Sequence, residues 1–157
     1  MSGMTKTVWI HDDGGRAKAG FKGTTGDCAV RAISIATGRL YADVYAEMFD
    51  RNRDFAETRA GARKMKGRTS PRDGVFVEVM KKYMADAGWL WVPTMSIGSG
   101  CRVHLLPDEL PEGRIITRLS RHYCAVVDGV AHDIYDPTRE GTRCVYGYWE
   151  AGAPADW

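Results

Sequence analysis

The chain contains no glutamine, and asparagine occurs only once, at Asn52. Few amide side chains are therefore available to any active site. A run of about 18 apolar residues, the signature of a transmembrane helix, is absent, and the first residues lack the pattern of a secretory signal. We therefore expect a cytoplasmic protein that makes no contact with membranes.

Closely spaced cysteine pairs are also missing. The four cysteines are far apart in the sequence and form no CxxC pair: Cys28, Cys101, Cys124 and Cys144. This spacing argues against a zinc ribbon and against a dense disulfide scaffold, so we expect reduced thiols, no metal and no cofactor. A metal site that joins His104 or His132 to some of these cysteines is an alternative that a zinc assay would test.

A large excess of charge is absent as well. The formal net charge is +2 over 157 residues, which is too small to indicate nucleic-acid or membrane binding by itself. Positive charge is concentrated between Arg51 and Arg68, where seven residues are basic and two are acidic. This segment is typical of a solvated helix or loop, and weak contact with nucleic acid or an acidic partner through it is an alternative.

Apolar periodicity and turn residues predict helices first and strands afterwards. The helices are expected over residues 28–37, 41–52 and 71–87, and the strands over 6–11, 89–93, 114–119, 122–127, 130–136 and 142–149. We therefore predict one α+β domain over residues 1–157. Its helical half, about 1–88, packs on an antiparallel β-sheet from the second half, about 89–157.

Cys28 stands where a glycine-rich loop meets the first helix, with Asp27 as the expected N-cap. Backbone N–H groups and the helix dipole at this position favour a thiolate, which is the reactive form of cysteine. Arg31 is the only charged residue between Cys28 and Thr37, and we expect an internal salt bridge for it.

A cysteine nucleophile needs a proton carrier and a group that orients the carrier. His122 opens a predicted strand, and the partner carboxylate depends on the register of the hairpin that follows. A two-residue turn at Asp128-Gly129 places Asp133 on the same face as His122, whereas a three-residue loop places Asp136 there. Both registers remain open from the residues alone.

The segment HYCAVVDGVAHDIYDP resembles the histidine and Asp-Pro elements of papain-like cysteine peptidases. It is similar in particular to the bacteriocin-processing peptidases and to small papain-like proteins from phages and bacteria. The resemblance implies a papain-like fold with Cys28 as nucleophile and His122 as general acid/base. It also implies Asp136 as the orienting residue, because the family places its acid before this proline, and Asp133 is the alternative.

The same resemblance implies a thiol peptidase, isopeptidase or amidase that works through an acyl-thioester, in a bacterial host cytoplasm if a phage encodes it. Papain-like enzymes often hold the oxyanion with a glutamine, which this chain lacks. The remaining donors are the Cys28 amide, helped by Thr24, Thr25 or Gly26. The alternative function is an inactive papain-like fold that binds protein or nucleic acid.

Overall fold

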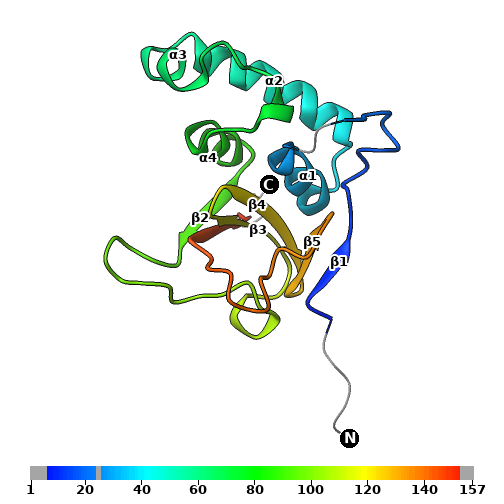
Figure 1. The fold of residues 1–157 in the computed structure, drawn as a ribbon, viewed down its shortest axis with the longest axis vertical. Helices are drawn as coiled ribbons and strands as arrows, with labels where there is room; N and C mark the ends of the chain where they lie inside the picture. Colours follow the sequence, from blue (N-terminus) through cyan, green and yellow to red (C-terminus); the bar gives the residue numbers. More distant parts are fainter. Residues whose placement is uncertain (1–6, 24–25, 153–157) are drawn as a thin grey trace, which may run out of the picture.

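The computed structural model describes residues 7–23 and 26–152 and contains helices layered on one side of a six-stranded sheet (Figure 1). The helices are α1 (Cys28–Thr37), α2 (Tyr41–Ala56), α3 (Arg59–Met65) and α4 (Val77–Asp86), with short 3-10 turns η1 (Pro71–Asp73) and η2 (Pro107–Glu109). The strands are β1 (Trp9–His11), β2 (Trp89–Pro93), β3 (Arg114–Leu119), β4 (His122–Val127), β5 (Val130–Asp133) and β6 (Gly147–Ala151). The α+β class is confirmed.

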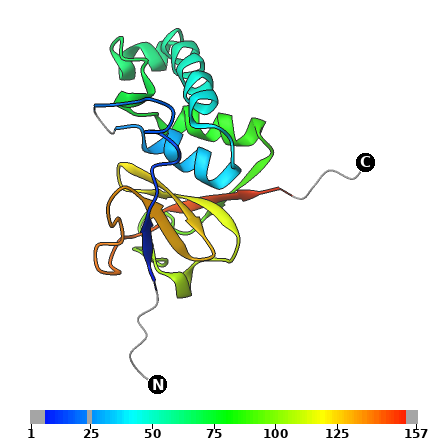
Figure 2. The same cartoon turned by 90° about the vertical axis from the view of Figure 1, so that its right-hand side faces the viewer.

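The sheet has the strand order β1-β5-β4-β3-β6-β2. Five strands pair antiparallel with their neighbours, but β1 pairs parallel to β5, with Trp9 opposite Ala131 and His11 opposite Asp133. The strands from residues 89–157 thus form the predicted antiparallel sheet, and β1 makes the whole sheet mixed, which the prediction did not include. The N-terminal strand lies along one edge of the sheet beside β5 (Figure 2), a long-range pairing that local pattern does not reveal.

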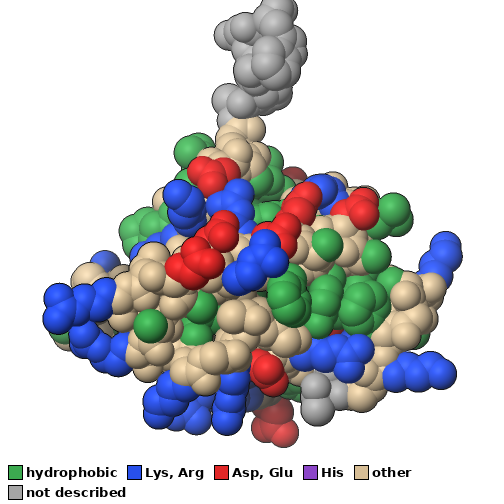
Figure 3. All heavy atoms as spheres, turned by 90° about the horizontal axis from the view of Figure 1, so that it is seen from above, with side chains coloured by type: hydrophobic (Ala, Val, Ile, Leu, Met, Phe, Trp, Pro, Cys, Tyr) green, Lys and Arg blue, Asp and Glu red, His purple; other side chains and the backbone are tan. Residues whose placement is uncertain are grey.

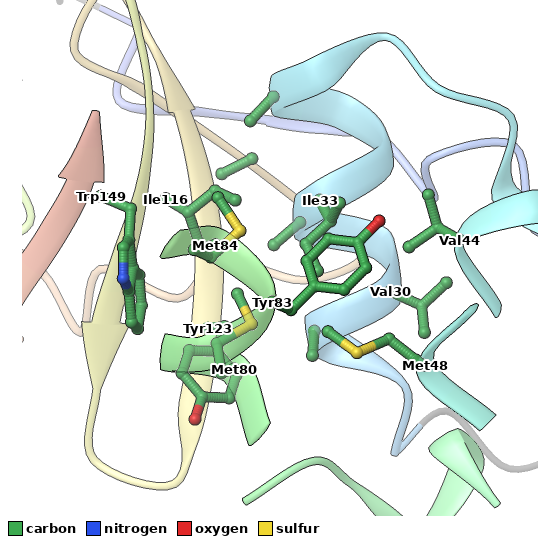
Figure 4. Close-up of a cluster of buried hydrophobic side chains, with 14 of the residues drawn as sticks. Val30, Ile33, Val44, Met48, Met80, Tyr83, Met84, Ile116, Tyr123 and Trp149 are labelled. Carbon is green, nitrogen blue, oxygen red and sulfur yellow. The ribbon is translucent and has the colours of Figure 1, made fainter. Parts of the chain in front are cut away.

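Helix α1 is buried because apolar side chains surround it on most sides. It begins at Cys28 and ends at Thr37 as predicted, with Gly38 as its left-handed C-cap. Its Val30 and Ile33 meet Met48 of α2, Met80 of α4 and Ile116 of the sheet in one core cluster (Figure 4). The start of α1 is thereby held in a fixed position against the sheet.

The other face of the sheet is covered by the long connections between strands rather than by helices. Here Leu105, Leu110 and Val145 form a second buried cluster with strand residues. A disulfide between Cys101 and Cys144 closes this layer, with the two Cα atoms 5.8 Å apart. The expectation that all four cysteines are reduced was therefore wrong, since a pair 43 residues apart in sequence is brought together only by the fold.

Helix α4 begins later than predicted. The expected N-cap Ser70 and first-turn Pro71 instead form η1, in which the Ser70 side chain accepts a hydrogen bond from the Arg72 N–H. Gly74 then takes φ = 110°, which interrupts the helix, and α4 starts only at Val77. The extended stretch that results, residues 74–76, becomes available to line a cleft.

The basic segment between Arg51 and Arg68 forms the end of α2 and the whole of α3, on the helical side of the molecule. Acidic neighbours pair with part of its charge, through Arg51–Asp86 at 2.6 Å, Arg53–Asp50 at 3.0 Å and a contact of Lys64 with Glu78. Figure 3 shows basic and acidic side chains interleaved on this side. Among the described residues, none of the helices has the length and apolar character needed to cross a bilayer.

The bounds of the last two strands also differ from the prediction. Strand β5 stops at Asp133 instead of continuing to Asp136, and β6 begins at Gly147 instead of Thr142. Residues 134–146 form an irregular connection between these two strands. This connection borders the start of β4, where His122 lies.

Candidate active site

Cys28 is the first residue of α1 and is partly exposed. Its side chain lines a cleft of about 760 Å³. One wall is formed by the start of α1 and the extended residues after η1, and the other by the β3–β4 turn and the stretch after β5. The thiol therefore lies in a groove that is open to solvent and lined by residues from both halves of the fold.

His122 is the first residue of β4 and is buried, with 8% of its surface exposed. Its imidazole is hydrogen-bonded to the carboxylate of Asp133 and interacts with the thiol of Cys28. Burial lowers the pKa of His122, but these two partners more than offset that effect and raise the pKa to about 9. The ring is consequently held as an imidazolium at neutral pH.

Asp133 ends β5 and supplies the carboxylate that meets this ring. Its Oδ2 lies 2.5 Å from His122 Nε2, which leaves Nδ1 as the ring nitrogen available to Cys28. Its Oδ1 accepts a hydrogen bond of 2.8 Å from the Ile134 N–H. Burial raises the pKa of Asp133, yet the hydrogen bond and charge of His122 outweigh it, so that the pKa is lowered and the carboxylate stays ionised.

The β4–β5 turn explains why Asp133 and not Asp136 takes this role. Asp128 and Gly129 have φ of 48° and 83°, the two positive values of a tight two-residue turn, and Val127 pairs with Val130. Continuing this register places Asp133 opposite Cys124, on the face that His122 shares.

The prediction of Asp136 as the orienting acid was therefore wrong. Asp136 lies beyond the end of β5, and its Oδ1 accepts hydrogen bonds from the Thr138 N–H at 2.9 Å and the Thr138 hydroxyl at 2.7 Å. The position before Pro137 thus stabilises a local turn. The alternative register, and with it Asp133, is the one that the structure adopts.

Arg31 connects the helix to the same carboxylate. Its guanidinium forms an ion pair with Asp27 and a longer one, 3.4 Å, with Asp133 Oδ1. The internal salt bridge predicted for this buried arginine is confirmed. It joins the start of α1 to the end of β5, and so aligns the elements that carry Cys28 and Asp133.

Asp27 differs from its predicted role as an N-cap. Its side chain makes no capping hydrogen bond. It is completely buried and contacts Arg31, the Tyr41 hydroxyl and, at 3.1 Å, Arg16 Nε. The negative charge of Asp27 is therefore compensated by two arginines, and its carboxylate does not cap the helix.

Of the residues named as possible oxyanion donors, Thr24 and Thr25 lie outside the described residues. Gly26 borders the cleft beside Cys28, and a Cβ at this position would lie only 2.3 Å from the Arg72 carbonyl oxygen. Only glycine allows this close approach of the two backbones. The Cys28 amide belongs to the first turn of α1, whose N–H groups have no acceptor within the helix.

Two features of the site escaped sequence reasoning. Tyr135 lies against His122, with 5.5 Å between the ring centroids, and the extended residues Val75 and Phe76 line the cleft. The first could have been found from the two-residue register, which pairs Tyr135 with His122. The second could have been found from Gly74, which interrupts the helical pattern.

The two histidines that the sequence offers as alternative metal ligands have other partners. His104 Nδ1 lies 3.1 Å from Glu109, and His132 Nδ1 lies 2.9 Å from Asp12. Within residues 7–23 and 26–152, no cluster of three or more metal-ligating side chains occurs.

No protein-family model matches the chain, and no curated protein and no solved structure matches it either.

Proposed function

We propose that this protein is a cysteine-dependent hydrolase of peptide, isopeptide or other amide bonds. The observation that carries the proposal is the chain of interactions from Cys28 through His122 to Asp133, with Cys28 and His122 lining an open cleft. A thiol at a helix start, an imidazolium beside it and a buried carboxylate behind the ring are the three groups that thiol acyl transfer requires. The arrangement supports the papain-like resemblance of the sequence.

The reaction begins with attack of the Cys28 sulfur on the substrate carbonyl, which forms a C–S bond and a tetrahedral oxyanion. Collapse of this intermediate breaks the C–N bond, and His122 donates its proton to the departing amine. Water then attacks the thioester and gives a proton to His122, and the C–S bond breaks to release the acid. Asp133 keeps the ring oriented throughout and stabilises its charged form.

The oxyanion is held by backbone rather than by an amide side chain in this proposal. The Cys28 N–H at the positive end of α1 is the first donor, and the chain around Gly26 offers further amides at the same edge of the cleft. This assignment fits a sequence without glutamine. Thr24 and Thr25 remain sequence-based candidates for a second donor.

An activated ester tests the proposal without knowledge of the natural substrate. Incubation with p-nitrophenyl acetate should acetylate Cys28, detected by intact mass and peptide mapping, with a burst of p-nitrophenol. Cys28→Ser should lose the burst, and His122→Ala should slow it by a factor on the order of 100. Cys124→Ser is the matched control and should behave like the parent protein.

The proposal is wrong if Cys28 is not acetylated in the folded protein, or if His122→Ala acetylates as fast as the parent. The alternative of an inactive domain that binds protein or nucleic acid would then stand. Nucleic-acid binding through the segment from Arg51 to Arg68 would appear as an affinity that falls with added salt and is insensitive to Cys28→Ser.

The proposed location is the cytoplasm, that of a bacterial host if a phage encodes the protein. The Cys101–Cys144 disulfide argues in the other direction, because disulfides persist most readily in oxidising compartments. Trapping thiols by alkylation at the moment of cell lysis would distinguish the two. A cytoplasmic protein should show these two cysteines largely reduced, whereas export predicts the bonded form.

A further inference from the structure

A second hollow of about 550 Å³ continues from the cleft on the far side of His122. It shares Arg121, His122 and Tyr135 with the cleft but does not include Cys28. We name this hollow the arginine pocket, since three of its lining residues are arginines: Arg121, Arg139 and Arg143. None of them takes part in the reaction steps described above.

The charge of the arginine pocket is strongly positive. Three arginines and one carboxylate, that of Asp136, line it, while the ring of His122 is already paired with Asp133. One oxygen of Asp136 is already occupied by two hydrogen bonds from Thr138. The pocket therefore has more donors and positive charge than its own residues satisfy.

Arg143 is the most buried of the three arginines. It is 5% exposed, and it donates hydrogen bonds to the Ser120 carbonyl at 2.8 Å and the Pro137 carbonyl at 3.5 Å. A further contact joins it to Tyr135. Its Nε is buried and has no hydrogen-bond partner among the described residues. Because this Nε is inaccessible, the exposed Arg121 and Arg139 are the main donors that a ligand in the pocket can reach.

The backbone at the other two arginines is unfavourable for a side chain. Arg121 and Arg139 have φ of 56° and 51°, in the left-handed region where glycine or asparagine is usual. Both arginines are exposed and make no contribution to the core, so their side chains are available to a ligand in the pocket.

The place of the pocket identifies which part of a substrate would enter it. In the proposed reaction His122 gives its proton to the leaving amine, so the leaving side of the substrate lies against His122. A hollow that adjoins His122 but not Cys28 therefore receives the first residue after the cleaved bond. Guanidinium groups bind carboxylates through paired, charge-assisted hydrogen bonds.

We infer that the arginine pocket is a specificity subsite that selects a carboxylate on the amine side of the cleaved bond. The inference rests on the proposed function and adds the substrate class to it. The carboxylate is supplied by an acidic side chain at the first residue after the bond, or by the α-carboxylate of a short C-terminal peptide. Both sources present the same anion to Arg121, Arg139 and Arg143.

Partition of the acetyl-Cys28 intermediate between competing amines tests the subsite directly. The amine that resolves the thioester occupies the place of the leaving group, because aminolysis is the reverse of amide cleavage. Glutamic acid α-amide competes with glutamine α-amide to test an acidic side chain. Glycylglycine competes with glycylglycinamide to test a C-terminal carboxylate. The acetylated products are counted by mass spectrometry.

The carboxylate member of at least one pair should be acetylated about tenfold faster than its neutral partner. Arg121→Gly and Arg139→Gly should each bring the ratio close to one, and glycine suits the positive φ, so both variants should fold. Lys66→Gly is the matched control: it removes one positive charge from another exposed residue with positive φ, the C-cap of α3, and should leave the ratio unchanged. Equal acetylation within both pairs, or a preference that survives both arginine variants, overturns the subsite.

A binding measurement separates failure of the subsite from failure of the proposed function. ¹⁵N-labelled Cys28→Ala protein is titrated with glutarate and with glutaramide while the backbone amide signals are followed. Shifts at Arg121, Tyr135 and Arg139 with glutarate alone, and their loss in Arg139→Gly, support the anion site even if no acetyl-enzyme forms. Absence of shifts with glutarate counts against the site even if Cys28 proves reactive.

Discussion

The two free cysteines of the described chain lie near the same carboxylate but in opposite surroundings. Cys124 is buried within β4 and contacts Asp133 directly, and burial together with that negative charge raises its pKa well above the usual value. Cys28 is partly exposed at the start of α1 and meets Asp133 only through the imidazolium of His122. The same carboxylate therefore keeps one thiol protonated and supports a positive charge beside the other.

The two thiols thus differ in burial, which is the largest influence on Cys124, and in the order of their charged neighbours. A carboxylate next to a thiol disfavours a negative charge on the sulfur. A carboxylate on the other side of an imidazole instead keeps the imidazole protonated, and a positive ring favours a negative charge on a sulfur beside it. The predictions that follow test this difference between Cys28 and Cys124.

The largest expected effect is on alkylation by iodoacetamide at pH 7. Cys28 should react faster than Cys124 by a factor on the order of 100, because Cys124 is both inaccessible and protonated. Peptide mapping by mass spectrometry measures the two rates in one sample. In denaturant the ratio should fall close to one, and a ratio near one in the folded protein would contradict the comparison.

The second prediction concerns the two aspartates. Asp133→Asn should slow alkylation of Cys28 about tenfold, because His122 loses the charge that holds it protonated, and its pKa should fall from about 9 toward 6.5. NMR titration of the His122 ring measures that change. Asp136→Asn is the matched control and should alter both quantities little, since its carboxylate binds only Thr138 in the described structure.

The third prediction is a loss of stability between about pH 6.5 and pH 9. His122 has a pKa of about 9 in the folded protein and an ordinary value of 6.5, so its protonated form stabilises the fold fully below pH 6.5 and ceases to do so as pH rises through 9. The contribution is at most about 3 kcal/mol. Urea unfolding at several pH values measures it.

His122→Ala is the control for that experiment, because it lacks the group whose titration is being tested. The difference in unfolding free energy between the parent and His122→Ala should shrink as the pH rises. A difference that stays constant from pH 6 to pH 9.5 would show that the ring is not held as an imidazolium.

The smallest expected effect on the two thiols comes from the disulfide. Replacing Cys101 and Cys144 together by serine should lower the unfolding free energy by about 2–4 kcal/mol, because the bond closes a long loop of the unfolded chain. The alkylation ratio of Cys28 to Cys124 should change less than twofold, because the bond lies in the layer opposite the helices. A large change would link that layer to the active site.

Much of the local structure was predictable because it depends on neighbours in sequence. Helix α1 has the predicted bounds because apolar periodicity and Gly38 specify them, and β3 and β4 follow from β-branched and aromatic runs. The start of α4 was predicted wrongly because Ser70 and Pro71 serve a 3-10 turn equally well. The parallel pairing of β1 with β5 was missed because its partners lie more than a hundred residues apart.

The sequence by itself determined which residue types could form the site: a cysteine at a helix start, a histidine at a strand start and two acids shortly after it. Only the tertiary structure decided between Asp133 and Asp136, because the backbone angles at Asp128 and Gly129 set the register of every residue beyond the turn. It alone paired Cys101 with Cys144 and gathered Arg121, Arg139 and Arg143 around one hollow. These are contacts between distant segments, and their cause is the packing of the sheet and its connections rather than any local pattern.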